Sequence, residues 1–321
     1  MSVLVFADHS EGKFKKTAFE LISYGKQVAA QAGTGLTALT INAPDTSVLA
    51  AYGPDKILHV TDNRLNAFHA RAYADCISQA AAAESADIVI LDSTNNGLYL
   101  APVLAVKLEA GYAPNTMGLP TSMSPFTVKR KSFSSKAFNF TEILTDKKLV
   151  SLSKNSFGIK EDASHPEMAE FSPQLNEEDF QIDFVAIEKT TGKVTIADAD
   201  VVVSGGRGLK GPENWGMVEE LADVLGAATA CSKPVSDLGW RPHSEHVGQT
   251  GKPVTSNLYV AIGISGAIQH LAGVNSSKVK VVINTDPEAP FFKAADYGIV
   301  GDAFEVVPEL TKKLKEFKSS L

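Results

Sequence analysis

The chain has 321 residues, a formal net charge of −7, 44% hydrophobic residues and 21% charged residues. This length is typical of two domains, and the hydrophobic fraction suffices for an ordinary core in each. The acidic balance argues against nucleic-acid binding, which needs a basic face. The sequence shows neither a cationic, apolar leader nor an uncharged apolar stretch of about eighteen residues, so we expect a cytoplasmic or organelle-matrix protein without direct membrane insertion. Its two cysteines, Cys76 and Cys231, are expected to be reduced thiols.

Short apolar strands alternate with helical segments along the first 110 residues. This alternation predicts a parallel α/β sheet with right-handed crossovers. The expected strands are 3–7, 35–41, 56–60 and 87–91, and the expected helices are 17–31, 66–84 and 99–110.

From Pro114 onward the pattern changes to strands joined by turns. Strands are expected at 126–133, 137–144 and 149–157, and together they predict a β-meander added to the first domain. The basic trio Lys129, Arg130 and Lys131 is expected at a solvated edge of this meander.

The connection to the second half of the chain is polar. Residues 161–181 are acidic and proline-containing and are expected to be exposed, 184–188 is one more predicted strand, and 189–200 is the predicted linker. The sequence thus predicts an α/β protein with two doubly wound parallel-sheet domains, the first of which carries the added β-meander. The N-terminal domain is expected at 1–190 and the C-terminal domain at 200–321.

The second domain is organised around glycine-rich turns that follow buried strands. The apolar run 201–203 leads into the turn SGGRGLKG, with Arg207 at its centre, and then into a helix expected at 213–225. A strand, a glycine-rich turn and a helix in that order direct backbone N–H groups and the positive helix end toward a bound anion. The turn therefore predicts an anion site, to which Arg207 adds a permanent cation.

The same pattern recurs downstream. A strand at 258–264 leads into a second small-residue turn and a helix at 267–271, and the polar loop GQTGK precedes them at 248–252. Three such loops within about seventy residues predict a large, elongated ligand such as a dinucleotide. Strands at 279–284 and 297–300, the segment 304–307 and a last helix at 308–317 are expected to complete the domain.

The sequence agrees less well with other kinds of site that use glycine-rich loops. Gly206, Gly208 and Gly211 match the G-x-G-x-x-G pattern of nicotinamide sites, but the next strand ends in ACSK, without the acidic residue that such a site uses. Neither glycine loop has the spacing of a Walker A motif, and Ser265 lies outside a G-x-S-x-G motif. These observations disfavour a nicotinamide-dependent enzyme, a P-loop protein and a serine hydrolase.

Three histidines lie near the predicted loops. His243 and His246 are in a polar segment with no cysteine nearby, so we expect them at the surface and not on a metal. His270 lies on the first turn of the helix that follows the second small-residue turn. Its position leaves two interpretations open, a structural role or contact with the ligand of that turn.

Several segments resemble one family closely, the alpha subunit of electron transfer flavoprotein. They are SGGRGLKGPENW, VGQTGK, YVAIGISGAIQHLAG, INTDPEAPFF and DYGIVGDAFEVVPEL, and they cover nearly all of 200–310. The N-terminal domain resembles the family mainly in its order of strands and helices. The resemblance implies a heterodimer with a beta subunit and one FAD bound mainly by the C-terminal domain. It also implies an electron carrier and not an enzyme, with soluble dehydrogenases such as acyl-CoA dehydrogenases as donors and a membrane quinone oxidoreductase as acceptor.

The resemblance also implies roles for individual residues, none of them catalytic or metal-binding. Arg207 is expected near the flavin ring, where it stabilises negative charge on the reduced flavin; Thr250 is expected to hydrogen-bond the N5 region. His270 is expected near the pyrimidine end, where positive charge favours an anionic one-electron-reduced flavin. The other implied cofactor contacts are Ser232, Lys233, Gln249, Gly251, Ser265, Gly266, Ala267, Ile268, Gln269, Asn284, Asp302 and Ala303.

Lys233 departs from the family pattern, which commonly has arginine after the serine of this segment. Lysine keeps the charge but loses the planar fork of the guanidinium group. We therefore expect a shifted flavin potential or a different ring orientation in this chain.

Three alternatives remain beside the housekeeping carrier. One is a bifurcating or nitrogen-fixation-type flavoprotein, whose distinguishing features lie in the beta subunit. Another is a nicotinamide-dependent enzyme on a related fold. The third is a nucleotide-binding regulatory module on the N-terminal domain, whose first strand ends in ADHS without a glycine-rich loop. This last feature favours a partner-interaction role for the N-terminal domain.

Overall fold

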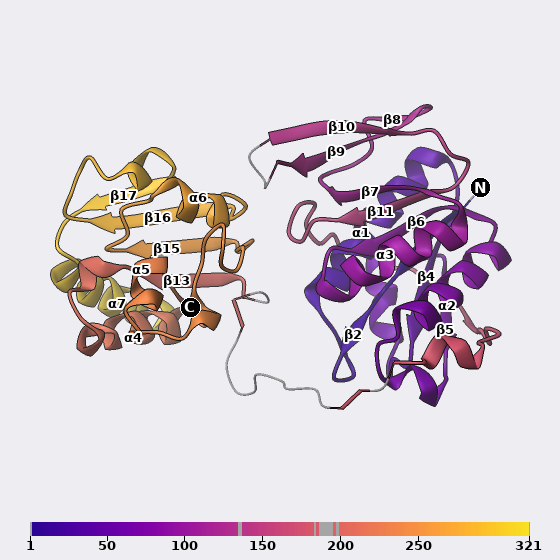
Figure 1. The fold of residues 1–321 in the computed structure, drawn as a ribbon, viewed down its shortest axis with the longest axis horizontal. Coiled ribbons are helices and arrows are strands. Elements are labelled where there is room, and N and C mark those ends of the chain that lie inside the picture. Colours follow the sequence, from indigo (N-terminus) through magenta and orange to yellow (C-terminus); the bar gives the residue numbers. More distant parts are fainter. Residues whose placement is uncertain (1, 134–136, 183, 186–194, 197–198, 321) are drawn as a thin grey trace. The chain divides into compact units, whose positions relative to one another are not determined.

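The computed structural model describes the chain except for residues 1, 134–136, 183, 186–194, 197–198 and 321. It divides the chain into two compact units: residues 1–133 with 137–187 form the first, and residues 188–321 form most of the second (Figure 1). The predicted strand 184–188 and the predicted linker 189–200 lie largely outside the described residues. Within the described ranges no helix has the length and apolarity that a membrane crossing requires.

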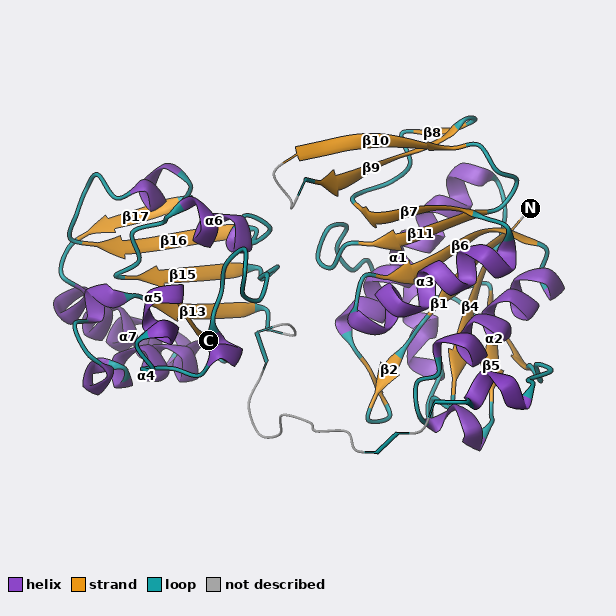
Figure 2. Cartoon of the chain, viewed as in Figure 1, coloured by secondary structure: helices purple, strands orange, loops and turns teal. Residues whose placement is uncertain are grey.

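The N-terminal unit is a parallel α/β sheet with helices on both faces (Figure 2). The sheet order is β10-β9-β7-β11-β6-β1-β4-β5-β12, and β8 pairs with β9. Alternate residues of β1 (Ser2–Phe6) face opposite cores, with α1 on one side and α2 and α3 on the other. The parallel strands are completed by β4 (Leu36–Ile41), β5 (Lys56–Val60), β6 (Ala86–Asp92), β7 (Gly111–Thr116), β11 (Lys148–Leu152) and the edge strand β12 (Glu167–Glu170), and the helices are α1 (Lys16–Ala32), α2 (Ala70–Ala83) and α3 (Asn95–Leu108).

The predicted β-meander is only partly correct. β9 (Phe126–Ser132) pairs antiparallel with β10 (Ala137–Ile143) and with the short β8 (Ser122–Met123), as an antiparallel extension. The third predicted strand is not part of it: β11 lies parallel between β7 and β6, inside the main sheet. Four of its five residues are buried, and such a strand is stable only in a sheet interior. The strands β7 and β12 were not predicted from the sequence, and a small hairpin joins β2 (His9–Ser10) to β3 (Lys13–Phe14).

Local capping explains two helix boundaries that the sequence pattern misplaced. α3 begins at Asn95, earlier than predicted, because the Thr94 side chain accepts a hydrogen bond from the Gly97 N–H and caps the helix. α2 begins at Ala70, later than predicted, because residues 63–66 form a separate 3-10 turn capped by Asp62.

The C-terminal unit has five parallel strands in the order β14-β13-β15-β16-β17. Helices α4 and α7 pack on one face of the sheet, and α6 and the turn Pro290–Lys293 pack on the other. α7 begins at Ala303, capped by the Asp302 side chain, so Pro308 lies inside the helix and not at its start as predicted. The elements are β13 (Val201–Gly205), α4 (Gly216–Leu225), β14 (Ala228–Cys231), α5 (Lys233–Asp237), β15 (Leu258–Ile262), α6 (Ile268–Val274), β16 (Val279–Asn284), β17 (Tyr297–Val300) and α7 (Ala303–Ser319).

Both units confirm the predicted fold class of parallel-sheet α/β domains. In the C-terminal unit the chain runs from β13 to β14 on one side and then to β15 on the other side of β13. The strand order therefore reverses between β13 and β15. Ligands of open α/β sheets bind at the carboxyl ends of the strands at such a reversal.

Candidate functional site

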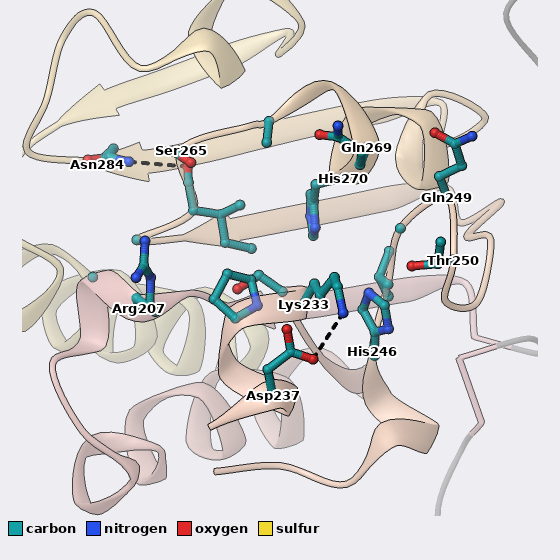
Figure 3. Close-up of a pocket in the computed structure, with 18 of the residues that line it drawn as sticks. Arg207, Lys233, Asp237, His246, Gln249, Thr250, Ser265, Gln269, His270 and Asn284 are labelled. Carbon is teal, nitrogen blue, oxygen red and sulfur yellow. Dashed lines mark hydrogen bonds and ion pairs between the residues drawn. The ribbon is translucent and has the colours of Figure 1, made fainter. Parts of the chain in front are cut away.

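A cavity of about 650 Å³ lies at this carboxyl edge of the C-terminal sheet (Figure 3). The segments that follow β13, β14 and β15, the end of β16 and the first turn of α6 all contribute side chains to it. Its volume falls within the range of sites for cofactors and drug-sized ligands. The three loops that the sequence singled out thus converge on one cavity.

Close backbone contact between two glycine turns forms one wall of the cavity. A Cβ atom on Gly206 would lie 2.2 Å from the carbonyl oxygen of Gly263, and one on Gly208 would lie 2.7 Å from its Cα. The N–H of Gly208 donates to the Gly263 carbonyl at 3.1 Å, and Gly263 itself has a left-handed φ of 62°. Only glycine allows this approach, which places Arg207 at the cavity.

The first turn differs from the predicted strand–turn–helix anion site. Two 3-10 turns, Arg207–Leu209 and Pro212–Asn214, separate β13 from α4, which begins at Gly216 and not at 213. From this stretch only Arg207 and Gly208 line the cavity. Positive charge therefore comes to this wall from the Arg207 side chain, and the N-terminus of α4 makes no part of the cavity lining.

Charged groups of both signs line the cavity. Lys233, the first residue of α5, places its Nζ 3.0 Å from Oδ1 of Asp237, and both side chains are more than half exposed. Arg207 contributes a second cation (Figure 3). Asp286 contributes a second carboxylate. An exposed lysine–aspartate pair of this kind is weak, so the Lys233 ammonium remains free to meet a ligand.

The loop 246–252 is held on two sides. The N–H of Val247 donates to the Cys231 carbonyl at 3.0 Å, and the N–H of Gln249 donates to the Gln269 carbonyl at 2.7 Å on α6. These bonds present Gln249 and Thr250 to the cavity. His246, at the start of the loop, is only 2% exposed and lines the cavity, so its predicted surface position is wrong. No group of three or more metal-ligating side chains occurs among the described residues.

His270 combines the two interpretations that the sequence left open. It is buried, with 7% of its surface exposed, and it also lines the cavity. Its Nε2 lies 2.9 Å from the hydroxyl of Tyr259. Burial, and then the neighbouring His246, lower the pKa of His270 to about 4, against an opposing effect of the Val247 carbonyl. The imidazole is therefore neutral near pH 7 and is not the cation that the resemblance implied.

The structure brings most of the predicted contact residues together. Those that line the cavity are Arg207, Ser232, Lys233, Gln249, Thr250, Ser265, Ala267, Gln269, His270 and Asn284. Those that do not line it are Gly251, Gly266, Ile268, Asp302 and Ala303.

Three of the predicted contact residues that do not line the cavity, Gly251, Gly266 and Asp302, have structural roles nearby. Gly266, at a φ of 83°, lets the turn pack on the backbone of Phe291, and Gly251 packs on His246 in a similar way. Asp302 caps α7 through the Phe304 N–H.

The sequence also missed lining residues. They are Gly208, Pro234, Asp237, His246, Val247, Gly248, Gly263, Ile264 and Asp286. Most of them adjoin a predicted contact, so extending each motif by a few residues would have found them. Asp237 is recognisable as the i+4 partner of Lys233 on one helix turn.

The lining fits an anionic cofactor with a heteroaromatic ring. The imidazoles of His246 and His270 both line the cavity, and among the described residues their buried Nδ1 atoms have no hydrogen-bond partner. Two cations and several side-chain amides and hydroxyls supply the remaining polar contacts. Fold and site together define a domain that binds a large nucleotide-type cofactor at the strand-order reversal.

Comparisons with known proteins identify the family to which this cofactor-binding domain belongs. Residues 195–275 match the family model described as the electron transfer flavoprotein FAD-binding domain, and residues 3–180 match the electron transfer flavoprotein domain. The chain belongs to the electron transfer flavoprotein family as an alpha-type subunit, and its C-terminal unit carries the family's FAD-binding domain.

Relatives match the chain over nearly its whole length. It is 35% identical to electron transfer flavoprotein subunit alpha of Thermoanaerobacterium thermosaccharolyticum, with 98% of both chains covered. It is 36% identical to the subunit of the same name from Bacillus subtilis, with 98% of this chain and 97% of the relative covered. It is 32% identical to Protein FixB of Clostridium saccharobutylicum, with 99% and 97% covered.

Proposed function

We propose that the chain is the FAD-holding alpha subunit of a heterodimeric electron carrier. In this role it takes electrons from soluble dehydrogenases, such as acyl-CoA dehydrogenases, and passes them to a membrane quinone oxidoreductase. The observation that carries the proposal is the set of groups that line the cavity at the strand-order reversal. Two cations, Arg207 and Lys233, lie among side-chain amides and hydroxyls, while His270 is buried and hydrogen-bonded to Tyr259. Such a lining is suited to holding and tuning a cofactor rather than to proton transfer with a second substrate.

Bound FAD supplies the redox chemistry, and the chain's own residues set its surroundings. Arg207 and Lys233 would hold positive charge near the ring and so would stabilise its negative, reduced state. Gln249 and Thr250, held by the loop 246–252, offer hydrogen bonds to the ring edge. Asn284 is fixed because it donates to the Ile264 carbonyl at 3.1 Å and accepts from the Asp286 N–H at 3.0 Å.

The other predicted contacts complete the binding site in this proposal. Ser232, Ser265, Ala267 and Gln269 line the cavity and would hold the remaining polar groups of the cofactor. Gly251, Gly266, Ile268, Asp302 and Ala303 would act through the backbone, by keeping the surrounding loops and the start of α7 in place.

The N-terminal unit is proposed to bind the beta subunit. Its own strand-order reversal lies between β1 and β6, where Asp8 and Asp92 follow or end the strands. Burial raises the pKa of both carboxyl groups, and Asp92 raises that of Asp8 further. Two half-buried carboxyl groups at this position disfavour a phosphate, so a partner-interaction role is preferred over a nucleotide-binding regulatory module.

The proposal is tested by co-expressing the chain with the product of the neighbouring gene. We expect a yellow heterodimer that contains about one FAD and that accepts electrons in single steps during reductive titration. A colourless, monomeric product would contradict the proposal. Transfer from an acyl-CoA dehydrogenase to a quinone oxidoreductase, measured with the purified complex, then tests the donor and the acceptor.

The similarity to Protein FixB favours a second candidate, a nitrogen-fixation-type or bifurcating flavoprotein. In that case the partner subunit carries a further flavin. About two FAD per heterodimer would support this candidate over the housekeeping carrier.

A further inference from the structure

A buried tyrosine lies against the cavity histidine. Tyr259, on β15, is 0% exposed and does not itself line the cavity. Its ring stacks on Phe291, with 6.3 Å between ring centroids and an interplanar angle of 4°. Its hydroxyl lies 2.9 Å from Nε2 of His270, whose side chain reaches the cavity from α6 (Figure 3). The pair therefore joins the sheet core to the cavity.

The hydrogen bond in this pair has a defined direction. Burial raises the pKa of Tyr259, so its hydroxyl stays protonated. The Ser204 hydroxyl lowers that pKa slightly against the larger effect of burial, but among the described residues it has no hydrogen-bond partner. Among the described residues, the hydrogen-bond partner of the Tyr259 hydroxyl is Nε2 of His270, so the buried O–H is satisfied when it donates to that nitrogen. A neutral imidazole that accepts at Nε2 carries its proton on Nδ1.

The surroundings of the other ring nitrogen agree with this tautomer. The Val247 carbonyl acts on His270 as a hydrogen-bond acceptor, yet Nδ1 is buried and has no partner at normal hydrogen-bond geometry. The titratable side chains that act on the pair are His246, which lowers the pKa of His270, and Cys231, which raises the pKa of Tyr259. None of these groups is a carboxylate that would hold a proton on Nε2.

We propose that Tyr259 is a positioning residue of the cofactor site, which holds His270 as the neutral Nδ1–H tautomer by donating to Nε2. His270 then presents no charge to the cavity, and the fixed cations are left to Arg207 and Lys233. The tautomer itself does not depend on the cofactor, whereas its effect on a flavin rests on the proposed function.

The tautomer is measured directly by nitrogen NMR of the heterodimer labelled with 15N-histidine. The chain has 7 histidines, and the His270→Gln variant assigns the signal. We expect Nδ1 protonated and Nε2 unprotonated, without titration between about pH 6 and about pH 8. A wild-type signal with protonated Nε2, or one that titrates near neutral pH, would overturn the proposal whether or not the complex binds FAD.

The Tyr259→Phe variant tests the role of the hydroxyl while keeping the stacked ring. We expect protonated Nε2 to appear in the variant, and the pH dependence of the potential of its bound flavin to differ from that of the wild type. The matched control is Tyr24→Phe, which removes another buried hydroxyl, from the N-terminal unit, and should change neither signal.

Each possible outcome of these measurements tests a different part of the proposal. An unchanged tautomer in Tyr259→Phe would overturn the positioning role. A changed tautomer with an unchanged pH dependence of the potential would overturn its effect on the flavin. A wild-type complex without FAD would instead overturn the proposed function and leave the tautomer standing.

Discussion

The contact between the two glycine turns makes Gly206→Ala the sharpest perturbation of the cavity wall. The new Cβ would lie 2.2 Å from the carbonyl oxygen of Gly263 and 2.7 Å from its carbonyl carbon. Both neighbours are backbone atoms, so the turn must move by about 1 Å to reach a normal contact. Overpacking of this kind typically costs about 1–3 kcal/mol.

The same displacement has a functional consequence. Gly206 immediately precedes Arg207, and its N–H donates to the Ile262 carbonyl at 2.8 Å. Moving the turn weakens this bond and shifts the Arg207 side chain in the cavity. We expect the free energy of unfolding to fall by about 2 kcal/mol and the affinity for FAD to fall at least about tenfold, which corresponds to about 1.4 kcal/mol of binding free energy.

Denaturant unfolding of the variant and titration of the flavin-free heterodimer with FAD measure the two effects. Gly216→Ala is the matched control, because a Cβ there meets nothing within 4 Å and the residue begins α4. It should leave FAD affinity unchanged and unfolding stability equal or slightly higher. If Gly206→Ala behaves like Gly216→Ala in both assays, the reasoning about this backbone contact is wrong.

Three further predictions concern the charged and titratable groups of the cavity. Burial lowers the pKa of His270 from its ordinary value of 6.5 to about 4 in the folded chain. Between about pH 4 and pH 6.5 the unfolded chain therefore binds more protons than the folded chain. Unfolding stability should fall as pH drops through this window, by up to about 3 kcal/mol, and His270→Gln should reduce the loss; equal pH profiles would contradict this. Arg207→Ala should lower the midpoint potential of the bound flavin by on the order of tens of millivolts, whereas Lys210→Ala, outside the cavity lining, should not; spectroelectrochemistry of both variants decides. Asp237→Asn should shift the potential upward, opposite to Arg207→Ala, because it removes a negative charge and releases Lys233; a downward shift would refute the assigned electrostatics.

Much of the fold could be predicted from local patterns of apolar and polar residues in the sequence. Buried strands such as β4 and β15 are short apolar runs with β-branched residues, and the structure places them within a few residues of the prediction. The loops that form the site could also be predicted from the sequence, because glycine-rich turns after parallel strands converge on one edge of a sheet. Arg207 and Thr250 lie in these loops, whereas Asn284 was assigned to the same ligand through the resemblance to the family.

Strand neighbours and burial were decided by contacts between residues distant in sequence. The insertion of β11 between β7 and β6 depends on long-range pairing, and the apolar pattern of a strand does not specify its neighbours. The burial of His246 also depends on tertiary contacts, since its loop is polar in sequence but is fixed by bonds to Cys231 and to α6.

The sequence by itself therefore determined the fold class and the set of loops that meet at the cavity, because strand periodicity and turn chemistry are local properties. It indicated the family through the resemblance of several segments of the C-terminal domain. The tertiary structure alone decided the state of the groups in those loops. His270 is neutral because packing surrounds it with Tyr259 and a dry core, and the close approach of Gly206 to Gly263 exists only once β13 and β15 are paired. Protonation and contact geometry depend on what the fold places next to a residue, and neighbours in sequence do not supply that information.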